Sequence, residues 1–426
     1  MFDFGKDLKR FVAEGVGGKP RDPRVLELLP TVAVAEQALA EGAVAAQAAR
    51  PWKAWRDVAL IWTSHARRTG LASSLDHAGR AAKRALDAAP AGHAFALAQA
   101  TAAEVLLARF DLRANGAALS EAEAAVEAGA HEPNSRKGQA AVSAVHARLS
   151  ARRALMEDDP SQVRAAAALL DQALHFDSRK SGDQDPWRAV RATELHLERA
   201  ELAVQAGLRW KDERLLDQAG RDLRQLIETL EGHLLPVSRA RAVRRCALAL
   251  SAVAELAGRR DAMEQAVEMS AAARDLFDVD HSPLDAGAAL SAQAQTLIRW
   301  QAEAPVLELL RAAEDMLARA WRLAEGRSTP LEVEVRIRAA RVKTLLAAQS
   351  GDVVALSGQE ARLRSRLARG GEPRSAVDWA VDQLCLAGVY EALDDLGCRP
   401  GRSWAADYVR CEALEVLREE GVAATA

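Results

Sequence analysis

The pattern of the whole chain is clearest in residues 51–90, which read PWKAWRDVALIWTSHARRTG followed by LASSLDHAGRAAKRALDAAP. Apolar residues recur at helical spacing in both halves, so each half predicts one helix. The second helix carries small residues where two helices must pack closely, and it ends in ALDAAP at Pro90. Related helix pairs follow at a spacing of roughly 40–50 residues, in the range of helical repeat arrays. The chain is therefore predicted to be a stack of helix pairs.

The same spacing predicts eight pairs and one additional helix. The additional helix is expected at residues 25–49, before the first pair. First helices of the pairs are expected at residues 52–69, 93–112, 138–155, 187–206, 237–257, 284–301, 331–349 and 376–393. Second helices are expected at residues 73–89, 118–128, 161–176, 212–230, 261–277, 304–325, 353–369 and 403–419. Segments with proline or glycine separate the pairs, because proline is favourable at the start of a helix but not inside one.

Composition agrees with an all-helical chain of 426 residues. Hydrophobic residues make up 49% and aromatic residues 4%, and the abundant Ala, Leu, Arg and Glu favour helices. The 57 basic and 60 acidic residues give a net charge of -3, too weak a field to favour nucleic acid or an anionic membrane surface. Arginine far outnumbers lysine, as is typical of GC-rich bacterial genomes.

The sequence predicts a cytoplasmic protein that does not span a membrane. It contains no run of 18 apolar residues, and the first 25 residues lack an apolar stretch followed by a small-residue cleavage site. The four cysteines, Cys246, Cys385, Cys398 and Cys411, are widely spaced. They therefore predict free thiols and not a zinc or redox site.

Residues typical of catalysis or cofactor binding are not recognisable. The aspartate-rich DDxxD motif, the HExxH metal motif and the glycine-rich phosphate loops GxxxxGK[ST] and GxGxxG are all absent from the sequence. We therefore expect no catalytic, cofactor-binding or metal-binding residues, and an all-α enzyme is the least favoured alternative.

The first pair resembles the tetratricopeptide repeat, a helix pair of 34 residues with small residues in its second helix and a closing proline. Ala78, Ala85 and Pro90 stand at the spacings of that family. Most other units are longer and lack the family's Trp-Leu-Gly-Tyr set. The resemblance implies a right-handed α-solenoid of about eight antiparallel helix pairs with extra terminal helices, which binds proteins or peptides on a concave face without catalysis. Residues 1–23 would then be an N-terminal amphipathic segment and linker, and residues 24–426 a single domain.

Arginines three or four positions apart, and so on one helical face, recur in the expected first helices. In a stack these helices line the concave groove, and guanidinium groups bind carboxylates in a bidentate way. The pattern predicts a basic strip that binds an acidic segment of a partner protein. Its residues are Arg148, Arg152, Arg188, Arg191, Arg241, Arg245, Arg338 and Arg341. In the alternative interpretation, these arginines face solvent and pair with glutamates of neighbouring helices.

The helix expected at residues 237–257 has the densest positive charge. It carries Arg239, Arg241, Arg244 and Arg245 but a single acidic residue, Glu255. These arginines would bind the partner; in the alternative interpretation, three acidic residues of the following helix neutralise them across the pair, namely Asp261, Glu264 and Glu268.

A second candidate surface lies in the N-terminal sequence MFDFGKDLKRFV. Phe4, Leu8 and Phe11 stand at i, i+4 and i+7, which forms one apolar stripe on a helix, and basic residues flank it. Such a stripe would dock on a partner, lie in a membrane interface, or fold back to cap the first repeat.

The function expected from these features is that of a non-catalytic adaptor or regulatory scaffold. It would bind a segment of a partner protein, of acidic character, in the concave groove. The alternative is a repeat protein that responds to a peptide or small ligand by changing its superhelical pitch.

Overall fold

The computed structural model describes residues 23–423 apart from positions 133–135, 158, 179–186, 232–234, 304–305, 369–374, 399–400 and 402. Within these residues the chain forms seventeen α-helices and one 3-10 helix, and it contains no strand. The expected all-α class is therefore confirmed.

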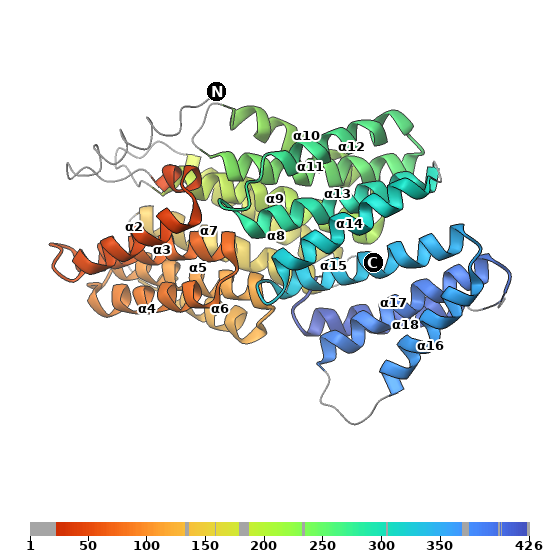
Figure 1. Ribbon diagram of the computed structural model, residues 1–426. Helices are drawn as coiled ribbons and strands as arrows, with labels where there is room; N and C mark the ends of the chain where they lie inside the picture. The colour runs from red at the N-terminus through yellow and green to blue at the C-terminus, as the bar shows by residue number, and fades with distance from the viewer. Residues whose placement is uncertain are drawn as a thin grey trace.

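The helices form eight pairs after η1 (Pro23–Leu28) and α2 (Thr31–Ala45). First helices of the pairs are α3 (Pro51–Thr69), α5 (His93–Arg113), α7 (Arg136–Met156), α9 (Arg188–Trp210), α11 (Pro236–Ala257), α13 (Pro283–Glu303), α15 (Thr329–Gln349) and α17 (Ala376–Asp395). Second helices are α4 (Ala72–Ala88), α6 (Gly116–Ala130), α8 (Pro160–Ser178), α10 (Glu213–Thr229), α12 (Arg260–Asp275), α14 (Leu307–Ala324), α16 (Val353–Ala368) and α18 (Ser403–Glu419). Consecutive helices pack against one another, so the architecture is an α-solenoid (Figure 1).

The first pair shows why these residues form and pack helices. Pro51 lies in the first turn of α3, where its missing N–H is not needed, and Gly70 ends the helix in the left-handed conformation. The face of α4 that meets the core carries small buried residues, including Ala78 and Ala85, in one cluster with Trp62 of α3. These small side chains allow the two helix backbones to approach closely.

The stack curls so tightly that its first and sixth pairs touch. Thr31, at the start of α2, donates its backbone N–H and its hydroxyl to the carbonyl oxygen of Asp280, at 3.0 and 2.9 Å. Helix α13 packs against α3, and α15 packs against α5. One apolar cluster therefore combines Ala66 and Leu112 of α3 and α5 with Leu284 and Leu331 of α13 and α15. The first helices thus surround a narrow interior.

The last two pairs depart from this regular stacking. In Figure 1, α16, α17 and α18 lie at the lower right, below the curl of the earlier helices. Helix α16 packs mainly against α17 and only lightly against α15, its partner in the pair. The chain end returns toward the first turn, because Leu417 and Val422 share an apolar cluster with Ala114 at the end of α5.

The expected helix ranges agree with the observed ones within a few residues, with one exception. Residues 25–49 form two elements, η1 and α2, which are separated at Pro30. The prediction of one continuous helix is wrong because proline lacks an N–H and disfavours the helical conformation of the residue before it. As a result, η1 lies against α9 and α11.

Candidate functional site

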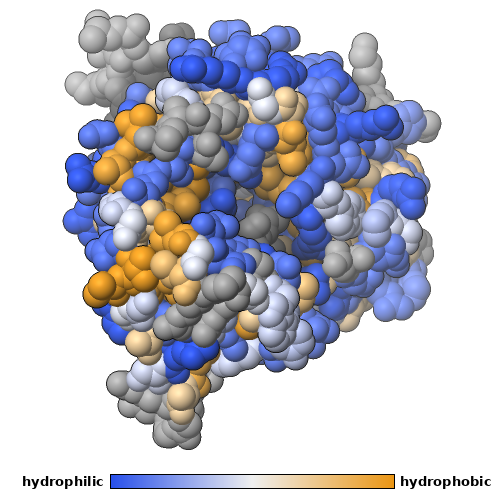
Figure 2. Space-filling view, turned by 90° about the vertical axis from the view of Figure 1, so that its right-hand side faces the viewer, coloured by the Kyte–Doolittle hydropathy of each residue, from blue (hydrophilic) through white to orange (hydrophobic). Residues whose placement is uncertain are grey.

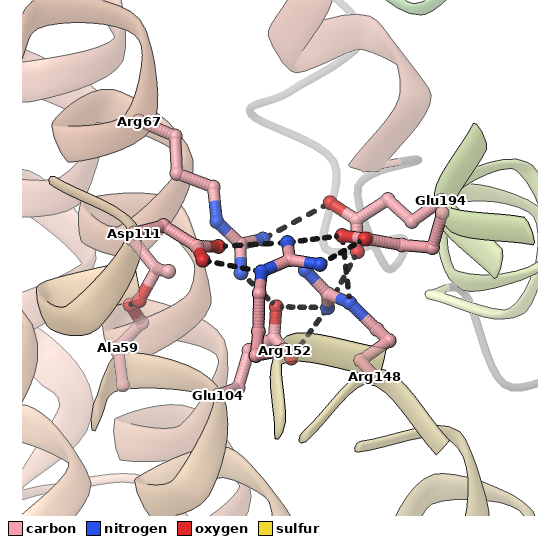
Figure 3. Close-up of polar contacts among 9 residues, drawn as sticks. Ala59, Arg67, Glu104, Asp111, Arg148, Arg152 and Glu194 are labelled. Carbon is pink, nitrogen blue, oxygen red and sulfur yellow. Dashed lines mark hydrogen bonds and ion pairs between the residues drawn. The ribbon is translucent and has the colours of Figure 1, made fainter. Parts of the chain in front are cut away.

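Charged side chains of the first helices meet in the interior and pair with one another (Figure 3). Arg148 of α7 is at the centre of this network and is 4% exposed. Its Nη1 lies 2.6 and 2.7 Å from the two carboxylate oxygens of Glu104 on α5 and 3.3 Å from Glu194 on α9. Its Nε donates to Glu198 of α9 at 3.3 Å. One arginine therefore joins three successive first helices.

Two more arginines complete the network. Arg152, one turn after Arg148, donates to Asp111 at 2.6 and 3.1 Å and to Glu198 at 2.5 and 2.8 Å. Arg67 of α3 lies 2.6 Å from Glu104 and 3.1 Å from Glu194. The dashed lines in Figure 3 show these contacts converging from separate helices.

The electrostatics of the network favour its charged form. Burial alone would raise the pKa of Glu104, but Arg148 and Arg67 outweigh that effect and lower the pKa to about 2. The pKa of Glu198 is lowered in the same way, because Arg152 and Arg148 outweigh its burial. The carboxylates are therefore ionised and already occupied by guanidinium groups at neutral pH.

Two arginines of α11, Arg241 and Arg245, pair with the first helices on either side. Arg241 donates to the carboxylate of Asp285 on α13 at 2.8 and 2.7 Å, and Arg245 forms an ion pair with Glu201 on α9. The expected neutralisation by Asp261, Glu264 and Glu268 of α12 is wrong. Those three side chains are exposed, and Asp261 and Glu264 lie 3.9 and 3.2 Å from Arg259 and Arg260 instead.

The remaining predicted residues are dispersed. Arg338 of α15 pairs with Glu334 and donates to the Ser291 hydroxyl at 2.8 Å. Arg188 and Arg191 lie half-buried near the start of α9, and Arg341 is exposed on α15. The stripe of Phe4, Leu8 and Phe11 lies outside the described residues. Acidic partners within the described part of the chain are recorded for Arg148, Arg152, Arg241, Arg245 and Arg338. Binding of a partner by these arginines stays a prediction.

A cavity lies beside the network, between η1 and the first helices α3, α5, α7, α9 and α11. Its volume is about 100 Å³. Helix η1 forms one wall, and its Glu27 accepts hydrogen bonds from the backbone N–H and the hydroxyl of Ser238, at 2.8 and 2.5 Å. Arg68 of α3 anchors the same segment by donating to the carbonyl oxygens of Leu26 and Leu29 at 2.8 and 2.7 Å. These contacts hold η1 inside the superhelix.

A larger groove of about 670 Å³ lies between α14, α15, α16 and α17. Its apolar lining includes Leu317, Trp321, Val335, Val381 and Val389. The groove exists because α16 packs on α17 and leaves the side of α15 largely uncovered.

Positive charge predominates among the ionisable residues that line this groove. Two of them are acidic, Glu314 and Asp382. The other four are basic, namely Arg336, Lys343, Arg362 and Arg366. Asp382 is 2% exposed and lies 3.1 Å from Arg366. Lys343 and Arg362 are exposed.

The sequence contains one local signal for this groove. Arg362 and Arg366 are four residues apart on one helix, the same spacing that identified the interior arginines. They lie on a second helix, whereas only first helices were expected to line a binding surface. The approach of four separate helices is a tertiary feature that local spacing does not predict.

Figure 2 shows the face at the right-hand side of Figure 1, which is hollowed near its centre. Hydrophilic residues predominate on this face, and hydrophobic residues form separate patches among them.

In the part of the chain that the structure describes, no helix has the length and apolar character needed to cross a bilayer. The same residues bring together no group of three or more His, Cys, Asp or Glu side chains suited to a metal ion.

Comparison with known proteins gives distant similarity to solved structures alone. No family model matches the chain, and no curated protein matches it. Among solved structures, the chain is similar to a circular tandem repeat protein with novel repeat topology and enhanced subunit contact surfaces. That similarity covers 94% of this chain and 97% of the other, with 16% sequence identity and a TM-score of 0.25.

Proposed function

We propose that the chain is a non-catalytic, tetratricopeptide-like scaffold that binds an acidic amphipathic segment of a partner protein in the groove between α14 and α17. The observation that carries this proposal is the combination of an apolar floor with four basic and two acidic residues in a groove of about 670 Å³. A cytoplasmic location belongs to the same proposal.

The groove supports this role better than the interior does. An acidic segment that entered the interior would have to displace Glu104, Glu194 and Glu198 from buried arginines, and separating buried ion pairs is unfavourable. In the groove, by contrast, Lys343 and Arg362 are exposed, and neither has an ion pair with a carboxylate among the described contacts. A ligand carboxylate can approach them without displacing one.

The size and lining of the groove set the kind of segment that fits. Its volume lies within the range of roughly 300–1,000 Å³ that is typical of ligand pockets. Trp321, Ala339 and Leu363 are partly exposed and provide apolar surface, whose burial supplies most of the affinity in such complexes. The surrounding cations supply orientation and faster association. A short helix with two or three apolar anchors and flanking Asp or Glu residues meets both requirements.

The test uses a library of displayed random 16-residue peptides selected against the full chain. We expect selected peptides to combine apolar residues with Asp and Glu. Their affinity should fall by about tenfold, or about 1.4 kcal/mol, in the double variant Lys343→Glu with Arg362→Glu, because two attractions become repulsions. Affinity is measured by fluorescence anisotropy, and circular dichroism checks that the variant is folded.

The matched control reverses two exposed charges elsewhere, with Arg80→Glu and Lys83→Glu on α4. This control should bind the selected peptides like the wild type. Peptides without acidic residues, or equal affinity for the groove variant and the α4 control, would contradict the proposal.

A further inference from the structure

Helix α18 presents two exposed aromatic side chains on one face. Trp404 and Tyr408, one turn apart, are 74% and 67% exposed. All nine tryptophans lie among the described residues, and Trp404 is the one that is exposed. Large aromatic side chains are enriched in protein interfaces, where their burial contributes strongly to affinity. The pair therefore marks α18 as an interaction surface.

The charges beside this pair are negative. The exposed charged residues described on α18 are all acidic, namely Asp407, Glu412, Glu415 and Glu419. Asp407 pairs with Arg410 at 3.1 Å, whereas the three glutamates have no ion pair among the contacts of the described residues. The aromatic pair and these four carboxylates lie on one side of the helix and form the acidic aromatic face of α18.

This face points away from the groove of its own chain. On the opposite side of α18, Ala406 packs with Tyr390 of α17, and Ala413 packs with Val381 of α17. Helix α17 is itself one wall of the groove between α14 and α17. Because α17 lies between them, the acidic aromatic face can meet such a groove only on another molecule.

Given the function proposed for the groove, on which this step rests, we propose that the acidic aromatic face of α18 occupies the groove of a second copy of this chain. The two surfaces are complementary in charge and polarity. Lys343 and Arg362 are exposed cations of the groove, and they would face the carboxylates of α18. The partly exposed Trp321 and Leu363 would pack against the aromatic pair.

The groove has room for the two rings. Its volume is about 670 Å³, and pockets of roughly 300–1,000 Å³ hold drug-sized molecules. The indole of Trp404 and the phenol of Tyr408 together are no larger than such a molecule. The helix backbone would then remain at the rim, where the carboxylates reach the cations.

The position of the two surfaces gives the contact a regulatory consequence. Helix α17 borders the groove on one side and packs against α18 on the other. Two copies can therefore exchange their α18 faces around a twofold axis and form the same contact twice. Such a dimer covers the groove, so self-association would compete with the binding of a partner segment.

The test is sedimentation velocity of the full chain at concentrations up to about 200 µM, which detects dissociation constants up to that range. A reductant is present throughout, because Cys411 is exposed on α18 and a disulfide would also join two copies. We expect a monomer–dimer equilibrium. Two double variants, Trp404→Ser with Tyr408→Ser and Lys343→Glu with Arg362→Glu, should each raise the dissociation constant by at least about tenfold.

Mixing these two variants is the decisive comparison. The first keeps an intact groove and the second keeps an intact α18, so an equimolar mixture should form heterodimers more tightly than either variant associates alone. If α18 instead packed directly on α18, the groove variant would associate like the wild type and mixing would restore nothing. That result would overturn the proposal.

The matched control is Val32→Ser with Leu39→Ser on α2, which removes two other apolar side chains that are 68% and 57% exposed. It should associate like the wild type, and circular dichroism checks that every variant is folded. A wild type that stays monomeric at all concentrations would overturn the proposal, and so would an equal loss of association in the α2 control.

Failure of this contact can be distinguished from failure of the function proposed for the groove. Acidic peptides selected against the chain should dissociate the dimer, because they occupy the same groove. If such peptides bind a chain that is monomeric, self-association is wrong and the groove function stands. If no acidic peptide is selected while the two variants still complement each other, the groove binds α18 and the broader function is wrong.

Discussion

Arg148 and Glu104, which are 44 residues apart in the sequence, are joined across α7 and α5 by one guanidinium nitrogen that lies 2.6 and 2.7 Å from the two carboxylate oxygens. Both side chains are buried, at 4% and 8% exposure. Because each also contacts a third helix, this pair connects α3, α5, α7 and α9. A buried ion pair of this kind fixes which helices meet, and losing one partner leaves the other charge uncompensated.

Replacing Arg148 with Ala should lower the free energy of unfolding by about 3 kcal/mol, because Glu104 and Glu198 would each lose a buried cationic partner. The measurement is urea denaturation followed by circular dichroism. Arg153→Ala on the same helix is the control. Its pair with Glu123 is part-exposed, with side-chain exposures of 43% and 39%, so the loss should stay below about 1 kcal/mol. Equal losses in the two variants would mean that the interior network contributes no special stability.

Replacing Gly70 with a residue that has a side chain should destabilise the protein for two reasons, and a second variant separates them. Its φ of 70° is strained for any other residue, and an added Cβ would lie 2.6 Å from the backbone oxygen of Arg327, just before α15. Gly258 has a similar φ of 61° but no neighbour within 4 Å of the added Cβ. We expect Gly258→Ala to cost about 1 kcal/mol and Gly70→Ala at least about 2 kcal/mol.

Thermal denaturation of these two variants therefore measures the contact between α3 and the start of α15. A Gly70→Ala variant that melts at the same temperature as Gly258→Ala would show that the first and seventh pairs separate in solution. Such a result would argue against the tight curl of the superhelix.

The regular part of the fold was predictable because its signals are local. Proline and glycine mark the helix ends, as at Pro51 and Gly70, and apolar spacing marks the faces that pack. The interruption at Pro30 was missed, although its physical signal was of the same kind. The interior pairing was not predictable in the same way. Arg241 meets Asp285 of α13 and not Asp261 of α12, because superhelical curvature decides which faces meet.

His65 should make the protein less stable as the pH falls from about 6.5 to about 4. Burial, with a smaller effect of Arg68, lowers its pKa from the ordinary 6.5 to about 4. Between these values the unfolded chain binds a proton that the folded chain does not, so unfolding becomes more favourable as the pH decreases.

A His65→Gln variant removes this proton and can keep a hydrogen bond to the Ser74 hydroxyl, which lies 2.9 Å from Nδ1. Between pH 6.5 and pH 4, the free energy of unfolding should fall more in the wild type than in this variant. After discounting for solvent screening, the difference should be on the order of 1–2 kcal/mol. His146→Gln, at an exposed position on α7, should reproduce the wild-type profile. The assignment is wrong if the two variants have the same pH dependence.

Glu27 should make the protein less stable as the pH rises, which is the opposite of the effect of His65. Burial raises its pKa from the ordinary 4.5, although the hydrogen bonds from Ser238 and the charges of Arg241 and Arg68 oppose this effect. The folded chain therefore holds the proton more tightly than the unfolded chain does. Stability is greatest below pH 4.5 with respect to this group, and it falls as the pH rises through the raised pKa.

Glu27→Gln imitates the protonated side chain and can still accept the hydrogen bond from the backbone N–H of Ser238. Its thermal midpoint should match that of the wild type near pH 4.5 and should be equal or higher at pH 8, where the wild-type carboxyl is more often ionised. Hydrogen exchange at the amides of η1 should show the same order, because Glu27 ties η1 to α11. If the wild type is instead the more stable protein at pH 8, the attraction of Arg68 and Arg241 exceeds the cost of burying the carboxylate. Glu27 would then be a permanently charged anchor of η1.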